Sequence, residues 1–532
     1  MSALKLAAPL FAFLAASLSC SAPDPTQPPP SPLAGSRPNI VLVLADDLSF
    51  RDLSIWGQQE FETPNLDRLA RGGLRFTQAY AGAPECAPSR GTLLSGLHTG
   101  HGPIRTNASA RGQDHLADAD VTIAEVLKSA GYATGFTGKW GVGLPATPGA
   151  PEKQGFDYAF GFYDQRRAHT YFPNYLYENG KRISYPANAG FDLERLYGLN
   201  VPNPDPEKLN RYDESGKLIM QDVADPAQAV FSEDPIEDNA LQFIRGHKDQ
   251  PFFLYFATQL PHGPPIIDHL RTLTGRDDYP GIMTKQWAAM VVRLDAFVGE
   301  LEAELKTQGV WENTIILFAS DNGYAMCGYL GRGNANANWP DDPFLHNKGP
   351  FRGGKFSALE GGTRVPFFAH WEDKIEPGVS NTPVWLVDLF PTFAELAGAT
   401  YEHSVDGDSL LPLFERRPSG FPAERPLYWE KHREQAVRLG PWKAFRPSPD
   451  DPLELYLIEE DIHGDRNLAD RYPEVVARIE QIMRDERTDH EWYWNPHETA
   501  EDYAAKRQRS KELGTLQVGV AGNSSSSHPM DP

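Results

Sequence analysis

The sequence predicts an α/β protein with a large, mostly parallel sheet flanked by helices and a smaller C-terminal α+β subdomain. Its strand-like runs are continuously apolar rather than alternating, which is typical of strands covered on both faces. Amphipathic helical stretches separate these runs, as in a doubly wound sheet. After about residue 413 the pattern changes to short strands followed by one helix. The 532 residues, 40% of them hydrophobic, supply enough core for a large domain and a small one.

Four strand-like runs lead directly into polar side chains. They are NIVLVLADD (39–47), YATGFTGKW (132–140), PFFLYFATQLPH (251–262) and TIILFASDNG (314–323). The helical stretches between and after them are 63–73, 121–131, 285–309 and 386–399. Ligands of such sheets bind beyond the carboxyl ends of the strands. We therefore expect the polar residues that end these runs to converge on one site.

Five segments follow from composition and pattern. They are a signal peptide (1–19), a Pro-rich tether (20–36), a catalytic domain (37–412), a C-terminal α+β subdomain (413–498) and a partly disordered tail (499–532). Within the large domain, residues 160–230 are aromatic and polar and predict an insertion of loops or a hairpin, with a tight turn at ENGK (178–181).

The N-terminus predicts export. Lys5 precedes a short apolar stretch, Leu6 to Leu18, and small residues then lead to Cys20. A cysteine there resembles the lipid-attachment cysteine of bacterial lipoproteins, although Ser17 stands where Leu is usual. We expect a periplasmic or cell-surface lipoprotein, with a plain cleaved signal peptide as the alternative.

Net charge and cysteine content indicate which partners are excluded and whether the cysteines are paired. The net charge of −22 argues against nucleic acid as a partner. Of the three cysteines, Cys20 is either lipidated or removed, which leaves Cys86 and Cys327. We expect these two to be unpaired, and a disulfide between them is the alternative.

Oxygen donors follow two of the apolar runs. Asp46 and Asp47 end the first, and Asp321 and Asn322 end the last. Oxygen-only sets suit the hard cations Ca²⁺ and Mg²⁺. Adjacent buried carboxylates also repel unless a cation neutralises them. The alternative is that these residues are solvated in loops.

Cys86 lies in APECAPSRGTLLSG (83–96). Pro88 and the residues from Ser89 onward predict a helix, whose N-terminus favours a neighbouring anion. Arg90 adds positive charge, and reactive cysteines lie in such surroundings. The alternative is a small buried apolar residue.

CAPSRGTLLSG fits the sulfatase signature, Cys-x-Pro-Ser-Arg followed by x-x-x-Leu-Ser/Thr-Gly, at every position. The resemblance covers about residues 37–480 and is closest to bacterial sulfatases of glycans. It implies the alkaline-phosphatase-like fold and hydrolysis of sulfate esters. It also implies that a formylglycine-generating enzyme oxidises Cys86 to Cα-formylglycine, so that a hydrated aldehyde is the nucleophile.

The remaining family motifs imply site residues. The metal ligands are Asp46, Asp47, Cys86, Asp321 and Asn322, for Ca²⁺ with Mg²⁺ as the alternative. The catalytic residues are Cys86, Arg90, Lys139, His262 and Lys355, the last from FRGGKFSALEGGTRVP (351–366). The substrate-binding residues are Lys139, His262, Lys355, Arg166 and His169. The diol attacks sulfur, His262 or Lys355 protonates the leaving alcohol, and the second hydroxyl then expels sulfate.

One position departs from the family. The second signature of the sulfatase family ends Gly-Lys-Trp-His, whereas this chain has Gly141 in place of the final His. The family His contacts formylglycine and helps to expel sulfate. His98, His101, His346 or water are the candidates to replace it.

The insertion indicates the substrate. Gln165, Arg166, Arg167 and His169, beside Tyr171 and Phe172, offer hydrogen bonds, charge and stacking for a sugar, although the aromatic residues could instead pack the insertion. We therefore expect a sulfated glycan. The rival hypotheses are a phosphate or phosphonate monoester hydrolase of the same superfamily, and a non-catalytic glycan-binding protein on a decayed sulfatase scaffold.

Overall fold

The computed structural model describes residues 31–165, 167–188, 211–212, 218–219, 228–263, 279, 282–326 and 340–514. Several predictions concern residues outside these ranges: the signal peptide, the lipid attachment at Cys20, most of the tether, Arg166, Cys327 and the tail after residue 514. The predicted segment boundaries, such as 412/413, stay predictions.

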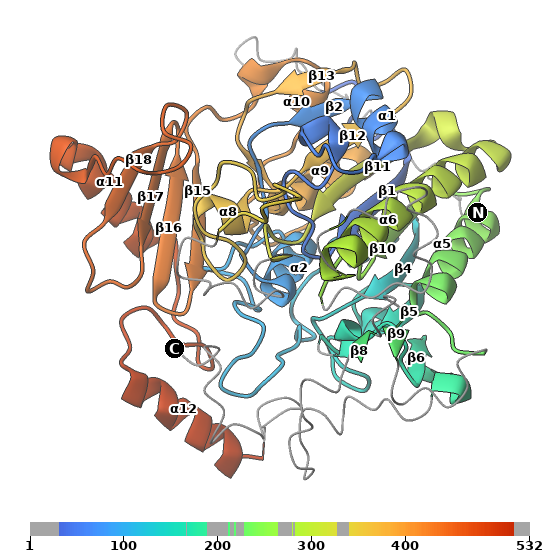
Figure 1. Ribbon diagram of the computed structural model, residues 1–532, viewed down its shortest axis with the longest axis horizontal. Coiled ribbons are helices and arrows are strands. Elements are labelled where there is room, and N and C mark those ends of the chain that lie inside the picture. Colours follow the sequence, from blue (N-terminus) through green and yellow to red (C-terminus); the bar gives the residue numbers. More distant parts are fainter. Residues whose placement is uncertain are drawn as a thin grey trace, which may run out of the picture.

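Within the described residues a ten-stranded sheet forms the centre of the molecule (Figure 1). From edge to edge its strands are β13 (Gly378–Ser380), β2 (Leu74–Phe76), β12 (Phe367–His370), β11 (Thr314–Ser320), β1 (Asn39–Ala45), β10 (Phe252–Ala257), β4 (Ala133–Lys139), β5 (Tyr158–Phe162), β6 (Tyr175–Glu178) and β7 (Lys181–Ser184). The five strands β11-β1-β10-β4-β5 are parallel, while β12, β6 and β7 pair antiparallel with their neighbours. This confirms a mixed, mostly parallel sheet.

Helices cover both faces of this sheet. The α-helices are α1 (Pro64–Gly72), α2 (Cys86–Ser95), α3 (Ile123–Ser129), α5 (Glu233–His247), α6 (Ile282–Thr307), α8 (Glu360–Thr363), α9 (Leu389–Ala397), α10 (Leu411–Phe414), α11 (Pro473–Asp485) and α12 (Ala500–Glu512). The 3-10 turns are η1 (Ser54–Trp56), η2 (Pro151–Lys153), η3 (Arg167–His169), η4 (Pro186–Asn188), η7 (Trp311–Asn313), η8 (Leu386–Asp388), η9 (Pro418–Gly420) and η10 (Ala469–Arg471).

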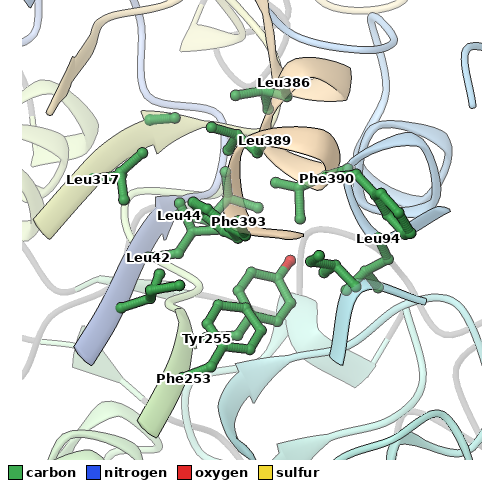
Figure 2. Close-up of a cluster of buried hydrophobic side chains, with 14 of the residues drawn as sticks. Leu42, Leu44, Leu94, Phe253, Tyr255, Leu317, Leu386, Leu389, Phe390 and Phe393 are labelled. Carbon is green, nitrogen blue, oxygen red and sulfur yellow. The ribbon is translucent and has the colours of Figure 1, made fainter. Parts of the chain in front are cut away.

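The two core layers follow from alternation along the central strands, because successive side chains point to opposite faces. Leu42 and Leu44 of β1 lie in the core layer that also holds residues of α2, α3 and α9. Val41 and Val43 lie in the other layer, against α1, α5 and α6. Figure 2 shows the first layer, where Leu42 and Leu44 face Phe393 of α9. Both faces are buried, which is why the strand sequences are continuously apolar.

Truncating one core side chain tests this layer. Leu42 is fully buried at the centre of β1, so Leu42→Ala loses apolar contact and leaves a cavity. We expect the free energy of unfolding to fall by about 2–5 kcal/mol, measured by chemical denaturation. Val379 on the edge strand β13 is 49% exposed, so Val379→Ala is the control and is expected to change stability little. Equal losses in both variants would contradict this assignment of the core.

A second, four-stranded antiparallel sheet follows in the chain, on the left of Figure 1. Its strands are β15 (Pro426–Lys431), β16 (Glu434–Leu439), β17 (Trp442–Arg446) and β18 (Glu454–Leu457). Helix α11 packs on it through Ile479 and Met483, as expected of a small α+β subdomain. Leu427 and Trp429 of β15 pack against Tyr80 and Trp385, which belong to a separate two-stranded pair, so the second sheet has a buried contact with that pair.

Three smaller features complete the fold. The predicted turn at 178–181 joins β6 and β7 as a hairpin. Two further two-stranded pairs form, β3 (Ala79–Tyr80) with β14 (Val384–Trp385) and β8 (Arg211–Tyr212) with β9 (Leu218–Ile219).

In the part of the chain that the structure describes, none of the helices combines the length and apolar character needed to cross a membrane.

Candidate active site

Four neighbouring strands carry the polar residues of the site at their carboxyl ends. Strand β1 leads into Asp46 and Asp47, and β11 into Asp321 and Asn322, while β4 ends at Lys139. The loop after β10 brings His262. The ladder continues into these residues, since Asp46 N donates to Leu260 O at 3.0 Å and Asp321 N to Ala45 O at 3.0 Å. Parallel pairing places all four strand ends at one edge, so residues far apart in sequence meet there.

The carboxylates form one buried cluster. Oxygens of Asp46 and Asp47, the Cys86 sulfur and a His262 ring nitrogen all lie within 4.8 Å of one another. Asp321 Oδ1 accepts a hydrogen bond from Asp47 N at 3.1 Å. All three aspartates are fully buried, and burial together with the neighbouring Asp46 raises the pKa of Asp321 to about 7. Carboxylates this crowded need positive charge close by.

Three buried cations supply that charge. Lys139 Nζ donates to Asp46 Oδ2 at 2.6 Å, and Lys355 Nζ to Asp47 Oδ2 at 2.8 Å. Arg90 donates to Asp321 Oδ2 from Nη2 at 2.8 Å and from Nε at 3.1 Å. Although burial alone would raise the pKa of Asp47, Lys355 and His262 hold it well below its usual range. Each carboxylate therefore has its own cationic partner.

The donor set fits a hard cation. Asn322 donates its Nδ2 to Asp47 Oδ1 at 2.6 Å. Its buried Oδ1 has no hydrogen-bond partner among the described residues. An oxygen held in this way beside three carboxylates is the kind of ligand that Ca²⁺ and Mg²⁺ prefer. Asp46, Asp47, Asp321 and Asn322 could therefore hold such an ion.

Cys86 begins helix α2, three residues earlier than the sequence indicated. Every residue of α2 is buried. The helix therefore has no solvent-exposed face and no amphipathic pattern that would indicate where it begins. Ala87 N, an N–H of the first turn, donates to Asn107 Oδ1 at 2.9 Å. The Cys86 thiol donates to Asp46 Oδ1 at 3.4 Å.

The thiol itself is unreactive. The sequence predicted electropositive surroundings typical of a reactive cysteine, and Lys139 and Lys355 do lower its pKa. Burial outweighs both lysines and raises the pKa of the Cys86 thiol far above its usual range. A protonated thiol is a poor nucleophile, so Cys86 as such is unsuited to attack an ester.

Two stacked histidines lie beside the cluster. His262 Nδ1 is 2.6 Å from Gly263 O, which places the proton on Nδ1 and leaves Nε2 as the acceptor for Lys355 Nζ at 3.2 Å. The ring of His169 stacks on His262 with centroids 4.1 Å apart. Burial lowers the pKa of both imidazoles well below the usual value. His262 lowers the pKa of His169 further, and Lys355 lowers that of His262 further.

The His262 loop is held by Glu233, which no sequence pattern indicated, and by Tyr171, which the sequence offered as a residue for stacking on a sugar or packing the insertion. Glu233, at the start of α5, accepts from Thr258 Oγ1 at 2.8 Å and from Gln259 N at 2.9 Å. Tyr171 donates its hydroxyl to His262 O at 2.7 Å. The first turn of α5 is rich in carboxylates, but nothing in the sequence relates Glu233 to the end of β10.

The other histidines proposed for the place of Gly141 have different partners. His101 Nδ1 lies 3.0 Å from Asp406 Oδ1, and His98 Nε2 lies 3.3 Å from Glu486 Oε2. His346 is an exposed residue 3.5 Å from Asp341. Their described contacts are with these carboxylates rather than with Asp46, Asp47 or Cys86.

Comparison with known proteins agrees with this geometry. A family profile described as Sulfatase matches residues 38–399. An N-acetylgalactosamine-6-O-sulfatase of Bacteroides thetaiotaomicron is 29% identical over 85% of this chain and 93% of its own length. Arylsulfatase A of Homo sapiens is 33% identical over 77% of this chain and 75% of its own length.

Solved structures have the same fold. The crystal structure of Ps i-CgsB in complex with k-i-k-neocarrahexaose is 26% identical, with a TM-score of 0.68, and the match covers 90% of this chain and 100% of that one. The family profile spans the strands that carry the carboxylates, the helix that begins at Cys86 and the segment of Lys355. This chain belongs to the sulfatase family and is a sulfuric ester hydrolase.

Proposed function

We propose that this sulfatase hydrolyses a sulfate ester on a sulfated glycan, with a nucleophile made by oxidation of Cys86 to Cα-formylglycine and with a bound divalent cation, Ca²⁺ before Mg²⁺. The single observation that carries the mechanism is the position of Cys86. Its side chain lies within 4.8 Å of the carboxylate oxygens, yet its thiol is protonated by burial. A nucleophile is needed there, and the unmodified cysteine cannot supply it.

The cation site consists of Asp46, Asp47, Asp321 and Asn322, with the oxidised residue 86 beside them. When bound, the ion supplies Lewis acidity and a template for the sulfate oxygens. Arg90 remains bound to Asp321 and orients that carboxylate and the side chain of residue 86 on the same helix. These roles follow from donor type and mutual distance.

Lys139 and Lys355 bind the sulfate group. Each now neutralises an aspartate, and a divalent ion at the same aspartates leaves both ammonium groups available to an anion. Because both side chains are buried, they stabilise strongly the charge that develops on the sulfate oxygens during attack. Lys355 protonates the leaving alcohol, either directly or through His262, whose Nε2 faces Lys355 Nζ at 3.2 Å and takes its proton first.

The glycan substrate is supported by the relatives and by the insertion. The bacterial relative is named for a 6-sulfate of N-acetylgalactosamine, and Ps i-CgsB was solved with an oligosaccharide. In this chain His169 is stacked on His262, so the insertion that begins near residue 160 borders the site. Arg166 is the other proposed sugar contact. We also propose export, a lipid anchor at Cys20 and a separate formylglycine-generating enzyme.

Chelation is expected to abolish activity. Removing the divalent ion leaves Asp46 and Asp47 bound to the two lysines that should hold the sulfate, so kcat should fall by at least about 10²-fold. Activity is measured after chelation and after add-back of Ca²⁺ or Mg²⁺. Full activity at a chelator excess that strips the ion, verified by metal analysis, would contradict the cation's role.

The substrate class has its own test. Rates are compared for a 6-sulfated N-acetylgalactosamine, an aryl sulfate, and the sulfate and phosphate esters of one alcohol. We expect kcat/KM to be highest for the sulfated sugar and low for the phosphate. Faster hydrolysis of the phosphate ester would favour the phosphomonoesterase alternative, and binding of the sulfated sugar with no turnover by a formylglycine-containing protein would favour a glycan-binding protein.

A further inference from the structure

One buried amide beside the active site has neither of its polar atoms satisfied. Gln165 is 3% exposed, and neither its Nε2 nor its Oε1 has a hydrogen-bond partner among the described residues. Its backbone is held, because Gln165 N donates to Gln113 Oε1 at 2.8 Å. Buried polar groups are almost always paired, so a buried carboxamide with no protein partner among the described residues indicates a partner from outside them.

The amide points toward the catalytic segment. A methyl group at Gly141 would lie 2.6 Å from Gln165 Oε1 and 3.7 Å from Arg90 Cδ. Arg90 in turn donates from Nη1 to Lys139 O at 2.6 Å. Arg90 follows Cys86 by four residues on α2, so both lie on one face of that helix. Gln165 Oε1 therefore lies against Gly141, and the side chain of Arg90, on the helix face that carries Cys86, borders the same position.

Gly141 makes room for this amide. Its backbone has φ +82°, a conformation that favours glycine, and the space in front of its Cα belongs to Gln165. The sulfatase signature has His at this position, so in this chain a carboxamide from the loop after β5 stands where that side chain would begin.

The chemistry of the amide limits what its partner is. A carboxamide offers donors at Nε2 and an acceptor at Oε1. A sulfate accepts hydrogen bonds but has none to donate, so it would leave Oε1 unpaired. A hydroxyl does both. Because a carboxamide does not titrate in the working range, it positions a hydroxyl and does not remove its proton.

We propose that Gln165 is a further catalytic residue of this site, whose carboxamide hydrogen-bonds a hydroxyl of the hydrated aldehyde at residue 86 and stabilises the hydrated form. The inference rests on the proposed formylglycine mechanism. It assigns the place of the family His to a group that acts by hydrogen bonding alone.

Gln165→Leu is the test, because leucine keeps the volume and removes both polar atoms. We expect kcat to fall by about tenfold or more, with KM changed little and with unchanged formylglycine content at residue 86. The melting temperature should stay equal or rise, since an unpaired buried amide has been removed. A structural glutamine would give the reverse: lost stability and unchanged kcat per folded molecule.

A second readout needs no substrate. An aminooxy probe reacts with the free aldehyde and not with the hydrate, so its labelling rate at residue 86 of the native protein reports the hydration equilibrium. We expect Gln165→Leu to label several-fold faster than the wild type. Tyr132→Phe is the matched control: the Tyr132 hydroxyl is also buried and unpaired among the described residues, but it precedes β4 at the end opposite Lys139.

The outcomes separate the two proposals. Wild-type protein that carries no formylglycine would overturn the proposed mechanism and this inference with it. Formylglycine present, with kcat and labelling rate of Gln165→Leu within twofold of Tyr132→Phe, would overturn this inference alone. Formylglycine present without sulfate ester hydrolysis would refute the proposed function, and the labelling rate would still decide the contact of Gln165.

Discussion

Cys86→Ala is expected to abolish sulfate ester hydrolysis, with kcat at least about 10³-fold below that of the wild type. The reason is positional. The side chain of residue 86 reaches the carboxylate cluster from the first turn of α2, and alanine leaves no oxygen there to attack sulfur. Turnover of a sulfated sugar is measured on protein whose formylglycine content is known from peptide mass spectrometry.

Two controls accompany this variant. Leu94→Ala truncates another fully buried residue of α2 and should lower stability while keeping activity per folded molecule. Cys86→Ser, in a host that leaves the serine unconverted, places a hydroxyl at the same position. Its sulfate ester cannot collapse to an aldehyde, so we expect at most one turnover. Sustained wild-type turnover by Cys86→Ala would be incompatible with the proposed nucleophile.

The sequence predicted the centre of the fold better than its margins. Strands β1, β10 and β11 were recognisable because each is buried on both faces and is therefore almost continuously apolar. Strand β4, ATGFTGK, is buried equally, with small and β-branched residues at most positions in place of large apolar ones. Strands β2 and β12 have three and four residues, too few for a periodicity to appear. Helix α5 was missed because its start, EDPIED, is polar and contains a proline.

The sequence predicted which residues gather at the candidate site, but it did not predict how their charges are paired. Motifs identified Asp46, Cys86 and Lys139 without structure, because their spacing within the signatures is distinctive. The pairing of one cation with each carboxylate depends on distances across strands that are far apart in sequence, and no local pattern encodes it. The unreactive Cys86 thiol could not be predicted from a local pattern either. Burial raises its pKa more than the two neighbouring lysines lower it, and the sequence alone indicates only the lysines.

The pairing of one cation with each carboxylate predicts a second large effect, on both stability and kcat, when Lys139 is replaced. The side chain is fully buried, with Nζ 2.6 Å from Asp46 Oδ2. Lys139→Met keeps most of the volume and removes the charge, which leaves the buried Asp46 carboxylate only the more distant Arg90, whose Nη2 is 3.7 Å from Asp46 Oδ2. In ion-free protein we expect a loss of about 3–5 kcal/mol in the free energy of unfolding. We also expect kcat to fall by about 10²–10³-fold, since a charge that stabilises the transition state is gone.

The divalent ion should restore much of the stability but not the activity. An ion at the aspartates replaces the missing positive charge and no longer competes with Lys139, so we expect it to bind the variant more tightly than the wild type. A 100-fold lower Kd narrows the stability gap by about 2.7 kcal/mol at saturating ion. The stability gap between Lys139→Met and the wild type should therefore be wide in chelator and narrow in saturating Ca²⁺. Chemical denaturation under the two conditions measures both gaps.

Lys443→Met is the matched control for this experiment. Lys443 is equally buried, with Nζ 3.6 Å from Glu360 Oε1, and burial lowers its pKa to about 8. It lies on β17 of the second sheet, so its loss should destabilise the protein to the same extent with and without the ion. The difference in the free energy of unfolding between Lys139→Met and the wild type could instead be the same with and without the ion. That result would mean that the cation does not bind at Asp46, because a positive charge at Asp46 must reduce the cost of losing Lys139.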